Sequence, residues 1–186
     1  MRTSILILVL LLSATAFARP CHDEDEREVC GERDIFFMPG GQAVLFAPHA
    51  AGVAPFWGGG VSITPFLWSH NTEHFGPSQG TVFLQASLLR SASSPSTLAL
   101  FEGGLTLSFE RNSSRRFAIP YFGFAFGGTL HDELGNAGYV YPMGGVHLFW
   151  HKNVVLDLQG GYHFPFESVD VLRGPRAQAV AQFSLW

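Results

Sequence analysis

The chain has few charged residues, little cysteine and, after its first 18 residues, no long hydrophobic run. Only 14% of its 186 residues are charged, against about 25% in an average globular domain. A formal net charge of −4 argues against a nucleic-acid-binding protein, and 47% apolar residues argue against a disordered chain. No run approaches the roughly 18 apolar residues that a membrane-spanning helix needs. The length suits one domain.

The first 18 residues have the features of a secretory signal peptide. Arg2 precedes the apolar stretch 5–12, and Ala16-Phe17-Ala18 has the small-x-small form of a cleavage site. We therefore expect export, with cleavage after Ala18.

Residues 19–34 form a short acidic segment with seven acidic and three basic side chains. It contains both cysteines, Cys21 and Cys30, and two cysteines in an exported chain favour a disulfide. We expect a solvated leader held by a Cys21–Cys30 bridge. A divalent-cation-binding loop and a contact for a basic partner remain alternatives.

From residue 35 onward, stretches of alternating apolar and polar residues are separated by breaks rich in Gly, Pro, Asn and Ser. No helical periodicity is sustained. The pattern predicts an all-β domain over 35–186 with eight strands, at 35–47, 53–69, 80–91, 97–110, 116–130, 139–151, 153–166 and 175–186.

The polar face of these strands carries few full charges. Asp157 and Gln159 lie opposite Leu156 and Leu158 in the alternation, and the other strands show mostly Gln, Ser, Thr and Gly on the polar side. In a β-sandwich that side would meet water and would normally carry Lys, Arg and Glu. Strands of ten or more residues exceed those of a sandwich and suit a tilted crossing of an apolar band about 25 Å tall. The alternation also places Val146, Leu148 and Trp150 opposite His147.

Five predicted strands contain consecutive glycines that lie near aromatic residues. None of these glycines opens a helix, so a phosphate-binding loop is not indicated. We expect them to allow strand curvature and to leave room for rings in a narrow barrel. The glycines are Gly58-Gly59-Gly60, Gly103-Gly104, Gly127-Gly128, Gly144-Gly145 and Gly160-Gly161.

Two segments, 141–162 and 119–124, carry a family resemblance. A Gly-rich strand, a tight turn with Asn153 and an aliphatic-Asp157-aliphatic strand resemble the sixth and seventh strands of small bacterial outer-membrane barrels of the OmpA transmembrane-domain type, and 119–124 is similar to the fifth. The resemblance covers 35–186. It implies an eight-stranded antiparallel up-and-down transmembrane β-barrel in the outer membrane of a Gram-negative bacterium.

The same resemblance implies partners and an insertion signal. Both termini would face the periplasm, and the partners would be outer-membrane lipid and the barrel-assembly machinery. Phe183, Leu185 and Trp186 would form the C-terminal insertion signal.

Polar residues on the inward face predict the contents of the lumen. An interior of eight strands is filled by side chains, which disfavours a diffusion pore. The inward set has no Lys or Arg at a strand centre, so we expect Glu102 and Asp157 to contact His147 or His163, or to be protonated. The polar residues assigned to the lumen are Glu102, Asp157, His147, His163, Gln85, Gln159, Gln178 and Gln182.

These features favour a monomeric protein with a structural or envelope-interaction role. We expect no catalysis, cofactor, metal or nucleic-acid partner. Two alternatives remain open at this point: an outer-leaflet enzyme that modifies lipid A, of the deacylase or acyltransferase type, and a soluble periplasmic lipocalin-like binder.

Overall fold

A computed structural model describes residues 33–34, 37–72, 76–110, 116–133, 135–151, 153–166 and 171–183, with the backbone alone at 33–34, 68–72 and 76–77. The predicted signal peptide 1–18 and the proposed Cys21–Cys30 bridge lie outside the described residues. In the described ranges no helix is long and apolar enough to cross a membrane.

Nine β-strands make up the regular structure of the described chain. In chain order they are β1 (Arg33–Asp34), β2 (Met38–Phe46), β3 (Phe56–Thr72), β4 (Gly76–Ser91), β5 (Thr97–Ser108), β6 (Phe117–His131), β7 (Ala137–His151), β8 (Val154–Pro165) and β9 (Gly174–Phe183).

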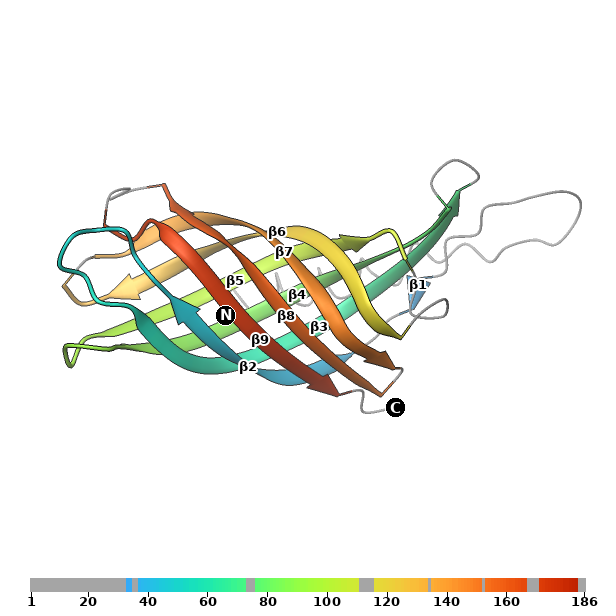
Figure 1. The fold of residues 1–186 in the computed structure, drawn as a ribbon, viewed down its shortest axis with the longest axis horizontal. Coiled ribbons are helices and arrows are strands. Elements are labelled where there is room, and N and C mark those ends of the chain that lie inside the picture. The colour runs from blue at the N-terminus through green and yellow to red at the C-terminus, as the bar shows by residue number, and fades with distance from the viewer. Residues whose placement is uncertain are drawn as a thin grey trace, which may run out of the picture.

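The strands β2 to β9 close into a barrel (Figure 1). Each of them pairs antiparallel with its neighbour in sequence, and β9 pairs back with β2. The two-residue β1 continues the line of β2 along β3, with Arg33 opposite Trp68. The predicted all-β, eight-stranded, antiparallel up-and-down barrel is therefore confirmed.

The connections between strands gather at two ends. Strands β2, β4, β6 and β8 end, and β3, β5, β7 and β9 begin, at what we call the loop end, on the left of Figure 1. Strands β3, β5 and β7 end, and β4, β6 and β8 begin, at the opposite turn end, together with the start of β2 and the end of β9.

The strand registers set the width of the barrel. We follow the paired residues around the barrel from Gly40 of β2. The path crosses β3, β4, β5, β6 and β7 and reaches Pro165 of β8. Extending the β8–β9 and β9–β2 registers past their last pairs returns to the line of β2 about ten residues further along the chain than Gly40. Such a stagger tilts the strands and leaves an interior just wide enough for side chains.

Two local features differ from the sequence prediction. The predicted break at 70–79 is instead part of a hairpin, because β3 continues to Thr72 and β4 begins at Gly76. The β3–β4 pairing therefore extends past the last β4–β5 pair, which joins Gln79 to Ser108. Backbone hydrogen bonds within a hairpin do not depend on an apolar face, which explains why this polar stretch forms strands. Figure 1 shows β3 and β4 projecting past the turn end.

A register shift in β7 places Trp150 on the opposite face from the one predicted from the sequence. The β7–β8 register shifts between His147 and Phe149, so the two sides of the strand exchange after this bulge. Trp150 is consequently buried beside His147, and the prediction that it faces the opposite way is wrong. A second shift, between Ile63 and Phe66, accommodates Pro65, which cannot donate to the ladder.

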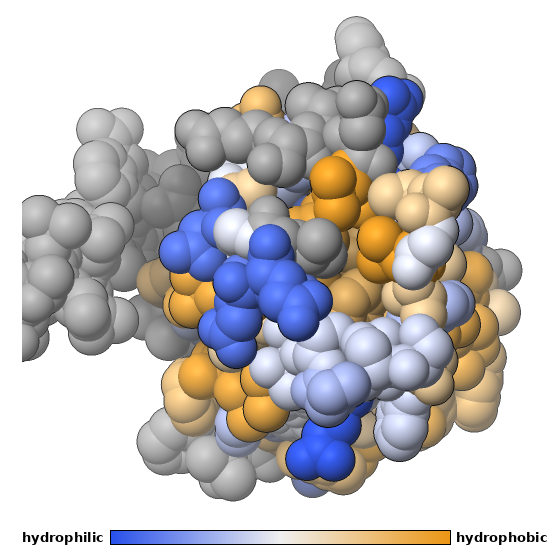
Figure 2. Space-filling view, turned by 90° about the vertical axis from the view of Figure 1, so that its left-hand side faces the viewer, coloured by the Kyte–Doolittle hydropathy of each residue, from blue (hydrophilic) through white to orange (hydrophobic). Residues whose placement is uncertain are grey.

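The barrel is apolar outside and largely polar inside. The exposed large apolar side chains of the described residues retain 40–62% of their surface. Figure 2, which looks onto the loop end, shows hydrophobic groups along the flanks and hydrophilic groups over parts of the end itself. The exposed set is Phe37, Leu45, Trp57, Val61, Leu84, Leu88, Phe101, Phe109, Phe117, Phe122, Phe124, Phe126, Leu130, Leu148, Leu156, Leu158, Phe166 and Phe183.

Apolar side chains fill both ends of the interior. The loop-end cap, which continues inward along the lumen, includes Phe46, Phe56, Leu89, Leu98 and Leu172. The turn-end cap consists of Met38, Leu67, Ile119, Trp150 and Val155. Buried polar residues lie between the two caps, and we call them the lumen network.

Candidate functional site: a polar network inside the barrel

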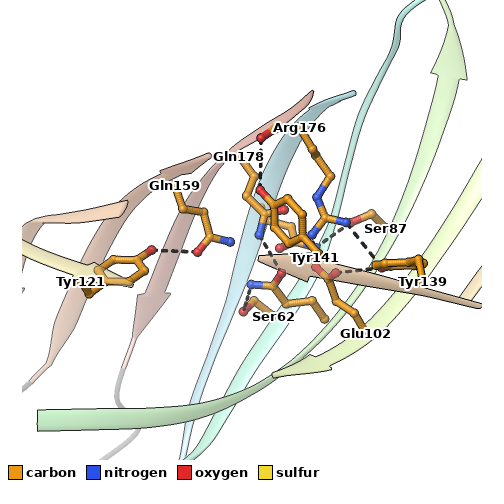
Figure 3. Close-up of polar contacts among 11 residues, drawn as sticks. Ser62, Ser87, Glu102, Tyr121, Tyr139, Tyr141, Gln159, Arg176 and Gln178 are labelled. Atoms are coloured by element: carbon orange, nitrogen blue, oxygen red, sulfur yellow. Dashed lines mark hydrogen bonds and ion pairs between the residues drawn. The ribbon is translucent and has the colours of Figure 1, made fainter. Parts of the chain in front are cut away.

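A buried ion pair between β5 and β9 holds the charges of the lumen network (Figure 3). Arg176 Nη2 donates a hydrogen bond to Glu102 Oε1. The hydroxyl of Tyr139 donates to the other carboxylate oxygen of Glu102 at 2.8 Å, and it accepts from Arg176 Nη1 at 3.4 Å. The side chains of Arg176 and Glu102 are 0% and 3% exposed. Both charges are thus removed from water and neutralise each other.

Aromatic rings of β7 support the arginine. The guanidinium carbon of Arg176 lies 3.7 Å from the ring centroid of Tyr141, which is cation–π contact. The Tyr141 hydroxyl donates to the backbone carbonyl of Arg176 at 3.1 Å. Tyr139 faces Gly127 across the β6–β7 ladder, where a Cβ would lie 2.7 Å from the Tyr139 hydroxyl. The glycine therefore leaves room for the tyrosine.

Arg176 corrects two predictions about the lumen. The expectation that the buried carboxylates have no cationic side chain beside them is wrong, and Glu102 contacts Arg176 and Tyr139 rather than a histidine. A guanidinium is always charged and offers five donors, so it neutralises a buried carboxylate more completely than imidazole does. The signal was present in the sequence, since Arg176 has the same parity as Gln178 and Gln182 in the last strand.

The second carboxylate pairs with histidine near the turn end. Asp157 and His147 face each other across the β7–β8 ladder, and His147 Nδ1 is hydrogen-bonded to Asp157 Oδ1. The imidazole packs between Tyr121 and Trp150, with ring centroids 4.3 and 4.2 Å away. The Tyr121 hydroxyl donates to Gln159 Oε1 at 2.7 Å. This part of the network ties β6, β7 and β8 together.

Glutamine side chains connect the other side of the barrel. Gln178 Nε2 donates to Gln85 Oε1 at 2.9 Å, and Gln85 Nε2 donates to the Ser62 hydroxyl at 3.3 Å. Gln182 Nε2 lies 3.1 Å from the Ser62 hydroxyl and 2.9 Å from that of Thr64. These bonds join β9 to β3 and β4 across the interior.

His163 is fully buried away from either carboxylate. It packs against Tyr139 and Phe46, with ring centroids 4.0 and 5.0 Å away. Neither ring nitrogen has a hydrogen-bond partner among the described residues. Of the two histidines predicted as alternative partners for the acids, His147 contacts Asp157 as predicted, and His163 contacts neither acid.

The remaining predicted site residues are only partly described. Phe183 lies on the outer face, with 53% of its surface exposed. Leu185 and Trp186 lie outside the described residues. Within the part of the chain that the structure describes, no group of three His, Cys, Asp or Glu side chains is placed to hold a metal ion.

The lumen network is suited to holding the barrel together. Its hydrogen bonds join strands that are far apart in sequence, and its charges are paired. Buried polar groups of this kind favour one register because a shifted strand would leave them unpaired. No family model, curated protein or solved structure matches this chain.

Proposed function

We propose that this protein is an integral outer-membrane β-barrel with a structural or envelope-interaction role. The observation that carries the proposal is the reversal of polarity, with large apolar side chains exposed on the outer face and Gln, Ser, Thr, Glu and Arg side chains buried inside. Soluble monomers rarely expose apolar patches larger than a few hundred Å². Lipid hydrocarbon around the barrel would remove the free-energy cost of exposing these apolar side chains to water.

The height of the apolar wall supports the proposal. Exposed aromatic side chains lie near both ends, for example Trp57 and Phe126 toward the loop end and Phe109 and Phe117 toward the turn end. From Phe117 to Phe126, β6 advances roughly 30 Å, which a tilt of about 40° reduces to roughly 23 Å. This is close to the band of about 25 Å between the aromatic girdles of outer-membrane barrels.

The two apolar caps and the lumen network support a role other than general diffusion. Side chains occupy the interior at both ends and in the middle, as expected for eight strands. The polar interior also differs from the apolar cavity that a lipocalin-like binder of apolar ligands would need. By the family resemblance, the turn end would face the periplasm and the loop end the outside.

The decisive experiment measures whether the chain folds into a bilayer. Purified protein refolded into vesicles should run at a different position in a detergent gel before and after boiling, as folded barrels do, and should sediment with the vesicles after a carbonate wash. In expressing cells it should be recovered from the outer-membrane fraction. Recovery of folded protein from the periplasm without detergent would refute the proposal and favour the lipocalin-like alternative.

A separate measurement tests the absence of catalysis. Mass spectra of lipid A from expressing and non-expressing cells should be identical. A change in the acyl chains of lipid A would instead support the enzyme alternative.

A further inference from the structure

A basic and aromatic cluster lies on the outer face at the loop end, apart from the lumen network. Here the chain continues the β2–β9 pairing beyond the two strands. The amide of His49 donates to the carbonyl of Arg173 at 2.8 Å, and that of Ala47 donates to the carbonyl of Pro175 at 3.0 Å. The exposed residues His49 and Arg173 are thus held side by side by a regular ladder.

Two rings from β8 hold the guanidinium of Arg173. Its central carbon lies 5.6 Å from the ring centroid of Tyr162 and 5.4 Å from that of Phe164. The Tyr162 hydroxyl forms a 2.9 Å hydrogen bond with His49 Nδ1. We call His49, Tyr162, Phe164 and Arg173 the rim cluster. Contact with the two rings restricts the side chain of Arg173, which remains exposed to the surroundings of the barrel.

The rim cluster marks the border between the apolar wall and the loops. Phe166, the first residue after β8, is 61% exposed. On β9, the outward residues toward the middle of the barrel are small: Pro175, Ala177 and Ala179. Between Arg173 and the middle of the barrel, the outer wall is therefore apolar and carries only short side chains, so a hydrocarbon chain can lie against it.

We propose that the rim cluster binds the phosphate of an anionic lipid headgroup in the leaflet at the loop end. The inference rests on the proposed membrane location. The planar fork of Arg173 matches two phosphate oxygens, and amphipathic rings such as that of Tyr162 are typical at the level of headgroups. The apolar wall beneath the cluster favours a phosphate attached to acyl chains over free phosphate.

The test compares lipid binding by the full exported chain and its variants. Each protein is inserted into nanodiscs that contain equal amounts of phosphatidylcholine and either phosphatidylglycerol or lipid A. Native mass spectrometry after release then gives the ratio of anionic to zwitterionic lipid retained. Arg173→Gln should lower this ratio about fivefold, or about 1 kcal/mol, as expected for one basic residue at an anionic surface. Arg173→Lys should lower it less, because the charge remains while the bidentate fork is lost.

Arg116→Gln provides the matched control, because Arg116 is exposed at the opposite end and its change removes the same charge. It should leave the ratio of anionic to zwitterionic lipid unchanged, and 50 mM inorganic phosphate should not displace the bound lipid. If Arg173→Gln inserts normally and keeps the wild-type ratio, or if inorganic phosphate abolishes the preference, the lipid site is refuted and the membrane proposal stands. If the wild-type chain fails to insert, both proposals are refuted.

Discussion

Removing one member of the Glu102–Arg176 pair should destabilise the barrel far more than removing both. In Glu102→Gln, the guanidinium of Arg176 stays 0% exposed without its counter-charge. Loss of one partner of a buried pair typically costs about 3–5 kcal/mol. In the double variant with Arg176→Gln neither charge remains, so we expect it to recover at least about 2 kcal/mol of this loss.

Urea unfolding of vesicle-inserted protein, followed by tryptophan fluorescence and by gel mobility, measures these free energies. Glu133→Gln, at an exposed position in the β6–β7 connection, is the control and should stay within about 0.5 kcal/mol of wild type. Arg176→Lys should fall between wild type and Glu102→Gln, since it keeps the charge but loses the stacking on Tyr141. A Glu102→Gln protein as stable as the control would refute the reasoning, because the pair could not then be buried and mutually dependent.

Three further substitutions test other parts of the barrel. Gly127→Ala places a Cβ 2.2 Å from a backbone carbonyl of β5 and should cost about 1–3 kcal/mol in urea unfolding, whereas Gly144→Ala, with its nearest atom at 3.7 Å, should be almost neutral. Asp157→Asn replaces a charged partner of a buried histidine and should lower the temperature of the gel-mobility transition; an unchanged temperature would contradict a structural role for this contact. Leu84→Arg, on the outer wall, should cost about 2–4 kcal/mol for folding into vesicles, while Ser93→Arg at a loop tip should cost nothing measurable. Equal effects of these two arginines would argue against a lipid-facing wall.

Alternation in the sequence assigned the inner and outer faces of β8 and β9 correctly. Gln159, Gln178 and Gln182 are buried as predicted by parity, and Leu156 and Leu158 are exposed. Side-chain period and strand length are local properties, so they can be inferred without knowing which strands pair.

Contacts that depend on the complete barrel could not be inferred in the same way. Glu102 and Arg176 are 74 residues apart, and they meet only because the stagger brings β5 and β9 to facing positions across the lumen. The position of Trp150 depends on a bulge, which adds one residue to β7 and leaves no clear trace in the alternation. The hairpin at 70–79 was missed because its polar residues do not alternate, although its backbone pairs regularly.

Because the barrel closes through β2 and β9, the domain cannot complete its folding strand by strand from the N-terminus. Thr64 bonds to Gln182, 118 residues later, and Gln85 bonds to Gln178, 93 residues later, so the interior contacts of early strands await the last strand. Sequence separations of this size slow folding, because loop-closure entropy is lost before the contacts form. Until synthesis reaches β9, the growing chain presents two open strand edges and an unmatched set of amide side chains. It therefore needs to be kept from premature association during that interval.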